Sequence, residues 1–285
     1  MDYLIIALIT FISGVVGTGL GGVVGAVMKR DSNKIVSLLL SFAAGIMLAV
    51  VCFDLMSKPI EMMKEGTMPP LTPLIVVAAV VVGYGVVYLL NLLIDKKTNL
   101  EVKHIDKDHP ATADDLDELI HSNHYETHKN SKSHLFVAGL VMMFAIALHN
   151  LPEGMVIGAS YATADVMTTL FTGSGFIMAI VIGLHNVPEG MAVSVPLISG
   201  GMSKPKAILL TALSGLPTVF GALLGFALGG INDIMLILSL GFASGAMLYV
   251  VFGELLPESI LMWRSKLPAF ALFAGVIAGF LLVMF

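Results

Sequence analysis

The chain has 285 residues, of which 57% are apolar and only 12% are charged, and its mean hydropathy is +0.93. A soluble domain carries roughly 25% charged residues, so this composition excludes an ordinary soluble globule, a disordered chain and a nucleic-acid-binding protein. A net charge of −5 gives no polybasic surface, and the single cysteine, Cys52, excludes a disulfide framework and a cysteine-based zinc cluster. We therefore expect an all-α, polytopic membrane protein.

Eight segments are long and apolar enough to cross a bilayer, which takes about 20 mostly apolar residues. In chain order they lie near 3–28, 35–57, 72–94, 135–160, 173–198, 207–229, 233–256 and 267–285. We expect them to form a single membrane domain that covers residues 1–285.

The basic residues favour one orientation, because Lys and Arg collect in cytoplasmic loops. With the N-terminus outside, 13 of the 15 Lys and Arg residues fall on the cytoplasmic side, and only Lys58 and Lys64 fall outside. We therefore expect both termini to be extracytoplasmic, in a plasma (inner) membrane, and residues 95–134 to form the one long cytoplasmic loop.

The loop at 95–134 is polar and rich in histidine, a composition that predicts disorder. Histidine-bearing tracts bind metals loosely, so the loop is a candidate metal acceptor or sensor, and the alternative is a solvated tether. Residues 114–124 are also a candidate short helix. The six loop histidines are His104, His109, His121, His124, His128 and His134.

Two pairs of spans repeat. Residues 42–51 and 242–251 share the pattern Phe-Ala-x-Gly-x-Met-Leu-x-Val-Val, and Asp54-Leu55 then matches Glu254-Leu255. The preceding spans carry small residues at every fourth position, which lets helix backbones approach closely; these are Gly17, Gly21 and Gly25, and Gly221, Gly225 and Gly229.

Spans one and six enter from opposite sides in the expected topology, so the repeat is inverted and relates spans 1–3 to spans 6–8. Spans four and five lie between the halves, which gives a 3+2+3 arrangement. Inverted repeats are typical of secondary transporters, whose binding site lies near the bilayer midplane.

Spans four and five carry a second duplication, in which His-Asn-Leu-Pro-Glu-Gly at 149–154 returns as His-Asn-Val-Pro-Glu-Gly at 185–190. Each His lies four residues before its Glu, so the two share one helix face. A carboxylate at that depth costs roughly 2.5 to 3.5 kcal/mol, and a divalent cation shared by two His and two Glu would offset this cost. The alternative is a metal-free His–Glu pair that joins two helices.

The doubled motif resembles spans four and five of the ZIP (Zrt/Irt-like) metal transporter family. Eight spans, outward termini, a His-bearing cytoplasmic loop and a 3+2+3 repeat are similar to that family as well. The resemblance implies transport of divalent metal toward the cytosol, with the metal as substrate. It also implies a central site of His149, Glu153, His185 and Glu189, and a neighbouring second site completed by Asn150 and Asn186.

The sequence departs from the family in span six. Well-studied bacterial members have a glutamate there that helps to form the second site. Here Gly215-Leu216-Pro217-Thr218 occupies that stretch, and no acidic residue lies between 207 and 229. We expect one firm metal site and a weaker or absent second site.

Two further carboxylates stand at equivalent places in the repeat. Asp54 is expected near the outer end of span two, and Glu254 near the inner end of span seven, so that an ion would meet Asp54 first and Glu254 last. A series of such sites allows both entry and release. The alternative is that these acids only cap helix ends.

The sequence favours a transporter, not an enzyme, with zinc as the foremost substrate and iron, manganese and cadmium as others. No cofactor is required. The expected partners are divalent metal ions and the lipid bilayer, with a homodimer as a further assembly and no nucleic acid. Two alternatives stay open, an intramembrane zinc-dependent hydrolase and a proton-conducting His/Glu pathway; the first lacks a His-Glu-x-x-His motif.

Overall fold

The computed structural model describes residues 2–27, 33–64, 68–98, 132–162 and 166–284, and within these ranges the regular structure is entirely helical. Eight helical segments are long and apolar enough to cross a membrane, which confirms an all-α polytopic membrane protein. These segments are Asp2–Val27, Lys34–Lys64, Thr72–Leu93, Met142–Ala162, Ser174–Ser199, Lys204–Gly229, Asp233–Met262 and Leu267–Met284.

Four of the spans are built from more than one helix, because short π-helices or a break interrupt them. In chain order the elements are α1 (Asp2–Phe11), η1 (Ile12–Val16), α2 (Gly17–Val27), α3 (Asn33–Val50), η2 (Val51–Leu55), α4 (Ser57–Lys64), α5 (Thr72–Thr98), α8 (Lys132–Ala162), α9 (Val166–Thr169), α10 (Ser174–Ser199), α11 (Lys204–Ser214), α12 (Pro217–Gly229), α13 (Asp233–Tyr249), η4 (Val250–Leu255), α14 (Leu256–Met262) and α15 (Leu267–Met284).

Spans two and seven are longer than the sequence predicts. They continue as α4 to Lys64 and as α14 to Met262, instead of ending near 57 and 256. Pro257 lies in the first turn of α14, a position at which helices tolerate proline, so the proline does not end the span.

The helices also reach into both ends of the predicted loop at 95–134. α5 continues to Thr98 and α8 begins at Lys132, so His134 falls in a helix. The other five loop histidines, and the candidate helix at 114–124, lie outside the described residues.

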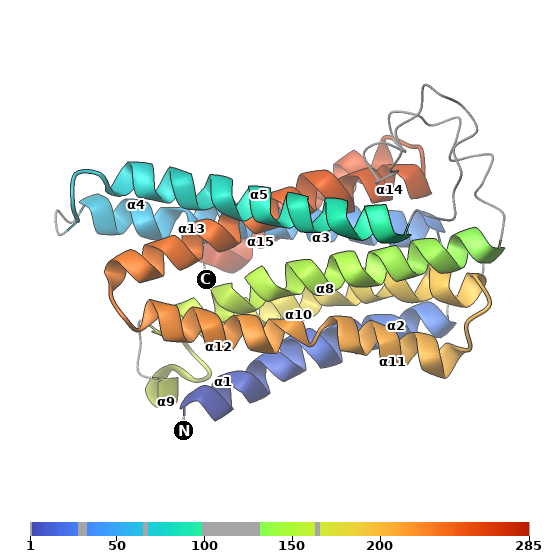
Figure 1. The fold of residues 1–285 in the computed structure, drawn as a ribbon, viewed down its shortest axis with the longest axis horizontal. Helices are drawn as coiled ribbons and strands as arrows, with labels where there is room; N and C mark the ends of the chain where they lie inside the picture. Colours follow the sequence, from blue (N-terminus) through green and yellow to red (C-terminus); the bar gives the residue numbers. More distant parts are fainter. Residues whose placement is uncertain (1, 28–32, 65–67, 99–131, 163–165, 285) are drawn as a thin grey trace.

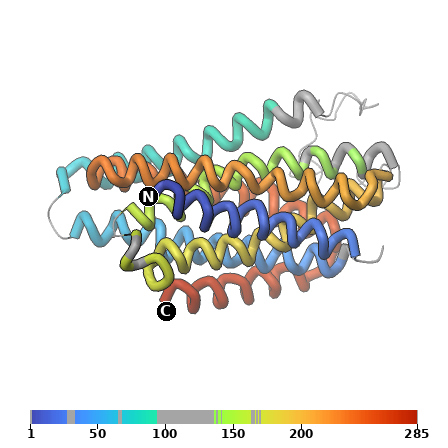
Figure 2. Tube along the Cα trace, turned by 90° about the horizontal axis from the view of Figure 1, so that it is seen from below, coloured from blue at the N-terminus to red at the C-terminus, as the bar shows by residue number. Residues whose placement is uncertain are grey.

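The helices pack side by side in one bundle, and the main contacts come in matched pairs (Figures 1 and 2). α3 packs along α15 and α13 along α5; likewise α2 packs along α10 and α12 along α8. In the predicted repeat, spans one to three correspond to spans six to eight. The contact of span two (α3) with span eight (α15) therefore corresponds to that of span seven (α13) with span three (α5). The contact of span one (α2) with α10 likewise corresponds to that of span six (α12) with α8. This pairing supports an inverted repeat with α8 and α10 between its halves.

Glycines bring the motif-bearing helices into backbone contact with spans one and six. A Cβ at Gly21 would overlap the carbonyl oxygen of Val187 on α10, and a Cβ at Gly221 would overlap that of Leu151 on α8. Small residues at these crossings allow the close approach. Span one therefore packs against the motif of α10, and span six against the motif of α8.

The two ends of the bundle differ in which helices begin and end there. α1 begins and α15 ends at the same end in both views (Figures 1 and 2), whereas α5 ends and α8 begins at the opposite end, together with α14 (Figure 1). This places the start and the finish of the helical bundle on one side.

Candidate metal centre

Both copies of the motif lie inside uninterrupted helices, with Pro152 within α8 and Pro188 within α10. A proline inside a helix lacks the N–H that would bond four residues back, so the carbonyls of Leu148 and Leu184 lose that partner. The polar side chains of the motifs all turn into the protein. Their exposure is at most 2%, for His149, Asn150, Glu153, His185, Asn186 and Glu189.

The His and Glu side chains pair crosswise between the two helices. His149 Nε2 lies 3.1 Å from Glu189 Oε2, and His185 Nε2 lies 2.8 Å from Glu153 Oε1. Each histidine therefore contacts the glutamate of the other motif. The spacing in the sequence had only placed each histidine on the same helix face as the glutamate of its own motif. The crossing brings all four groups together at the contact between α8 and α10.

Three of these residues meet the distance requirement for a shared ion. His149, Glu153 and Glu189 each offer one ligand atom, and these atoms lie within 4.8 Å of one another. His185 adjoins the group through its bond to Glu153. Imidazole nitrogen and carboxylate oxygen are suitable ligands for zinc and related divalent metals.

The crosswise pairs leave buried polar atoms without a partner. Glu153 Oε2, Glu189 Oε1 and His185 Nδ1 make no hydrogen bond. Burying such atoms unpaired is costly, and native structures rarely tolerate it without a water, an ion or a functional reason. Metal-free His–Glu pairs between the two helices would leave these atoms unpaired, whereas a cation among the carboxylates would give the carboxylate oxygens a partner.

The two asparagines use their amide groups on the backbone of spans one and six. Asn150 Nδ2 donates to the carbonyl oxygen of Ser214 at 2.9 Å, and Asn186 Nδ2 donates to that of Ser13 at 3.2 Å. Ser214 ends α11 and Ser13 lies in η1, where the regular helical pattern is interrupted. Sequence reasoning missed these anchors, because the interruptions become visible only in the folded backbone.

Glu254 lies closer to the centre than the sequence suggests. It is 2% exposed in η4, and its Oε2 lies 3.6 Å from His149 Nδ1. His149 thus has Glu189 within hydrogen-bond distance of Nε2, and Glu254 near Nδ1, which itself makes no hydrogen bond. Asp54, at the equivalent place in η2, is only half-buried. The register of a π-helix, which turns Glu254 inward, cannot be read from the sequence.

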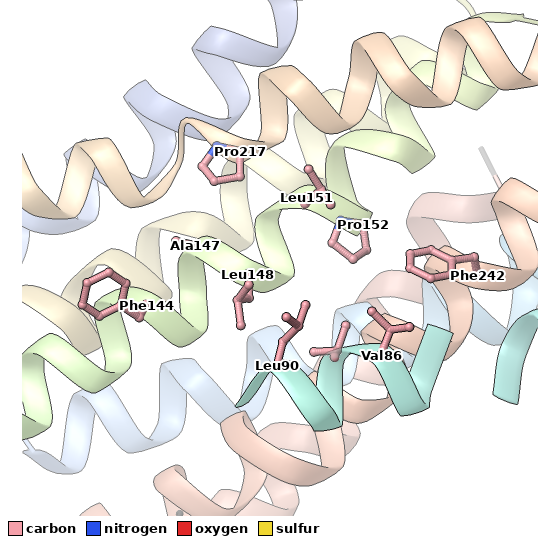
Figure 3. A pocket seen from close by; sticks show the side chains of 10 residues that line it. Val86, Leu90, Phe144, Ala147, Leu148, Leu151, Pro152, Pro217 and Phe242 are labelled. Carbon is pink, nitrogen blue, oxygen red and sulfur yellow. The ribbon is translucent and has the colours of Figure 1, made fainter. Parts of the chain in front are cut away.

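An apolar crevice of about 270 Å³ lies on the opposite face of α8, between α5, α12 and α13. Leu148 and Pro152 of α8 face Val86 and Leu90 of α5 across it (Figure 3). Its lining is entirely apolar, so the crevice offers an ion no ligand. The polar groups of the motif instead lie on the inner face of α8.

Comparison with known proteins gives a family match over nearly the whole chain. The family model described as ZIP Zinc transporter matches residues 2–285. A "Zinc transporter ZupT" of Chlorobium chlorochromatii is 32% identical over 244 residues, which cover 85% of this chain and 83% of that protein. A "Zinc transporter ZupT" of Clostridium perfringens is 28% identical, over 95% of this chain and 92% of that protein.

A third relative, the "Zinc transporter ZIPB" of Bordetella bronchiseptica, is 32% identical over 285 residues, which cover 96% of this chain and 77% of that protein. The structure agrees with this match, because it has eight helical segments that can cross a membrane and a buried His/Glu cluster. The chain therefore belongs to the ZIP zinc transporter family, as an integral membrane protein that transports divalent metal and is not an enzyme.

Proposed function

We propose that this transporter carries zinc foremost, toward the cytoplasm, and that the ion binds on its way among His149, Glu153, His185 and Glu189. The observation that carries the proposal is the pair of crosswise His–Glu contacts at 3.1 and 2.8 Å, with the remaining carboxylate oxygens unpaired. Rotation of those carboxylates toward a shared ion would satisfy the orphaned atoms.

The chemistry of the four groups supports a zinc-like ion. Two neutral imidazoles and two carboxylates together carry a charge of −2, which balances a divalent cation in a buried site. Two nitrogen and two oxygen ligands also match the four-coordinate geometry that zinc adopts in proteins. The same ligands accept iron(II), manganese and cadmium, so availability contributes to the choice of metal.

A single ion at this centre agrees with the surroundings. The amide of Asn150 is bonded at both ends, to Ser214 and Thr218, and Thr218 carries no charge. Of the two motif asparagines, only Asn186 has a side-chain oxygen without a hydrogen-bond partner. We infer one firm zinc site and at most a weak neighbouring site, with the two asparagines as its candidate ligands.

The test is metal uptake into proteoliposomes with the internal pH recorded. Glu153→Gln and Glu189→Gln keep the size of each side chain and remove its charge, and we expect uptake of zinc to be abolished. Glu61→Gln removes a carboxylate from the exposed surface of α4 and serves as the matched control. Uptake at the wild-type rate in the double Gln variant would overturn the proposed site.

The same recording decides between metal transport and the proton pathway that the sequence left open. A metal-free pH change that is lost in His149→Ala with His185→Ala, without any metal entry, would favour a proton-conducting His/Glu pathway. Metal entry that is lost in the same double variant would support the carrier.

The expected orientation has both termini outside, in a plasma (inner) membrane. The start of α1 and the end of α15 lie at one end of the bundle, which supports a common side for the termini. Protease protection of N- and C-terminal tags on intact cells tests the side. The homodimer and the metal-binding role of the loop histidines stay predictions; cross-linking in membranes and replacement of the six histidines by alanine test them.

A further inference from the structure

A hydrogen-bonded pair of polar side chains lies inside the bundle, where α5 packs along α13. Asn91 Nδ2 donates to the hydroxyl oxygen of Tyr249 at 2.8 Å, and the two residues are only 4% and 2% exposed. Polar side chains inside membrane spans are costly to bury, so their place calls for a reason. Neither residue belongs to the His/Glu cluster, so the role of the pair depends on what it holds in place.

The ring of Tyr249 is held against α5 by further contacts. Tyr249 is the last residue of α13 and directly precedes the π-helix η4. Its ring makes T-shaped contacts with Tyr84 and Tyr88 of α5, with ring centroids 5.4 and 5.9 Å apart. Aromatic pairs favour edge-on packing of this kind. Together with the hydrogen bond to Asn91, these contacts fix the ring at the start of η4.

The ring of Tyr249 covers the stretch of η4 that carries Glu254. A Cβ added at Gly253 would lie 2.9 Å from two carbons of the ring, so the ring packs directly on the backbone one residue before Glu254. Glu254 is 2% exposed, and its Oε1 makes no hydrogen bond. The place of its carboxylate therefore depends on the backbone of η4, which lies under the ring of Tyr249.

Glu254 lies where a small shift decides whether it bonds His149. Its Oε2 is 3.6 Å from His149 Nδ1, and this nitrogen makes no hydrogen bond. An approach of about 0.4 Å would bring the two atoms within hydrogen-bond distance. When a metal binds Nε2 of a histidine, Nδ1 carries the ring proton, and a carboxylate that accepts this proton orients the ring and makes it a better ligand. The position of η4 therefore bears on the metal centre.

The glycine crossings show which residue of span eight corresponds to the asparagine of the pair. A Cβ at Gly245 would overlap the carbonyl oxygen of Val80 on α5, and a Cβ at Gly45 would overlap that of Leu272 on α15. Gly45 and Gly245 are equivalent positions of the repeat, so Val80 corresponds to Leu272. The same offset pairs position 91 with Val283, whose side chain has no polar group.

The first half of the repeat therefore lacks such a pair, and its carboxylate is placed differently. Ala49 and Phe53 stand where the second half has Tyr249 and Gly253, and Phe53 is 45% exposed. Asp54, the acid of this half, is only half-buried. Both acids lie in a π-helix, η2 or η4, so the π-helix alone does not turn the acid fully inward. The inward acid belongs to the half that has the polar pair.

We propose that Asn91 and Tyr249 are positioning residues for zinc binding, which hold η4 so that Glu254 stands beside His149. The inference rests on the proposed function, because the zinc site it serves is the one built on His149. The pair touches no ligand atom and acts on the ion only through Glu254 and His149. Its loss should therefore weaken zinc binding without removing a ligand.

Equilibrium zinc binding to the purified protein, measured by competition with a zinc-sensitive dye, tests the proposal. Tyr249→Phe removes only the hydroxyl, and Asn91→Leu removes the amide while nearly keeping the size of the side chain. We expect each variant to lower the zinc affinity roughly 2–10-fold, the effect of one hydrogen bond. The two variants break the same bond from opposite sides, so a folding defect in one leaves the other as the test.

A double-mutant cycle with Glu254→Gln separates positioning from general packing. Because the pair acts through Glu254, adding Tyr249→Phe or Asn91→Leu to Glu254→Gln should cause no further loss of zinc affinity. A role in the packing of the bundle alone would give losses that add. Additive losses would overturn the proposal, as would wild-type affinity in the single variants or in Glu254→Gln itself.

Tyr161→Phe is the matched control, because it also removes the hydroxyl of a buried tyrosine. Tyr161 is 1% exposed, and its hydroxyl donates to the carbonyl oxygen of Leu170, between α9 and α10, at 3.2 Å. Its zinc affinity should equal that of the wild type, and a loss equal to that of Tyr249→Phe would overturn the proposal. Failure of the proposed function would be seen separately, as wild-type zinc affinity in Glu153→Gln with Glu189→Gln.

Discussion

The hydroxyl of Thr218 donates a hydrogen bond to Asn150 Oδ1, 3.3 Å away. Because Asn150 Nδ2 also donates, to Ser214 O, both ends of this amide are used within the protein. The other motif lacks this arrangement. Gly14 stands at the place equivalent to Thr218, with no hydroxyl to offer, and Asn186 Oδ1 has no partner.

We therefore expect Thr218 to limit the centre to one ion. Thr218→Glu would place a third carboxylate beside Asn150, and we expect the bound zinc to rise from one ion to two per chain. Metal content after equilibrium dialysis of the purified protein measures this. Thr218→Val, which has the same shape but no hydroxyl or charge, should still bind one ion; one ion in both variants would contradict the prediction.

We expect Glu254 to support the central site through His149, whose Nδ1 lies 3.6 Å from Glu254 Oε2. A carboxylate on the far ring nitrogen orients a ligating histidine, and loss of such a partner costs roughly 10–100-fold in metal affinity. We expect Glu254→Gln to weaken equilibrium zinc binding by this factor, as measured by competition with a zinc-sensitive dye.

Asp54→Asn is the matched comparison, because Asp54 holds the equivalent place in the first half without being buried against the cluster. Its effect should fall on the rate of uptake, with the equilibrium affinity of the central site unchanged. Equal loss of affinity in both variants would mean that Glu254 has no special relation to His149.

The glycine crossings should be essential for stability. Gly21→Ala and Gly221→Ala each drive a methyl group into a backbone carbonyl of a motif helix. Overpacking of this kind costs about 1–3 kcal/mol, so the midpoint of thermal unfolding in detergent should fall. Gly85→Ala is the control, because the added Cβ meets no heavy atom within 4 Å beyond its own stretch of helix; an equal fall there would mean that the loss does not come from the crossings.

Acid should weaken metal binding. Zinc binds neutral imidazole and ionised carboxylate, so protons compete with the ion for His149, Glu153, His185 and Glu189. The affinity should decline as the pH falls, by about tenfold per pH unit for each proton that the metal displaces. Calorimetry between about pH 7.5 and pH 5.5 in buffers of different ionisation enthalpy counts those protons; an affinity independent of pH would argue against histidine ligands.

Much of the architecture was predictable, because hydropathy and small-residue spacing act locally. A bilayer forces every backbone polar group to be satisfied within the span, so a long apolar run has to be a helix. The repeated pattern from Phe42 and from Phe242 predicted which spans correspond, and the matched helix contacts support that correspondence. The spacing of His149 and Glu153 likewise predicted a buried polar cluster.

The sequence was less informative about where helices deviate from regularity. The longer second and seventh spans depend on η2 and η4, and a π-helix follows from tertiary packing more than from local composition. For the same reason Glu254 was expected near a mouth of the pathway, whereas it lies against His149.

The sequence by itself determined that the protein is a helical membrane protein with a doubled His/Glu motif, because span length, hydropathy and residue spacing are properties of a single segment. Only the tertiary structure decided that each histidine pairs with the glutamate of the other helix, that the asparagines bind the backbone of spans one and six, and that Ser37 and Ser41 meet Ser259. These contacts depend on the rotation and register of helices far apart in the chain, which are set by how their surfaces pack together.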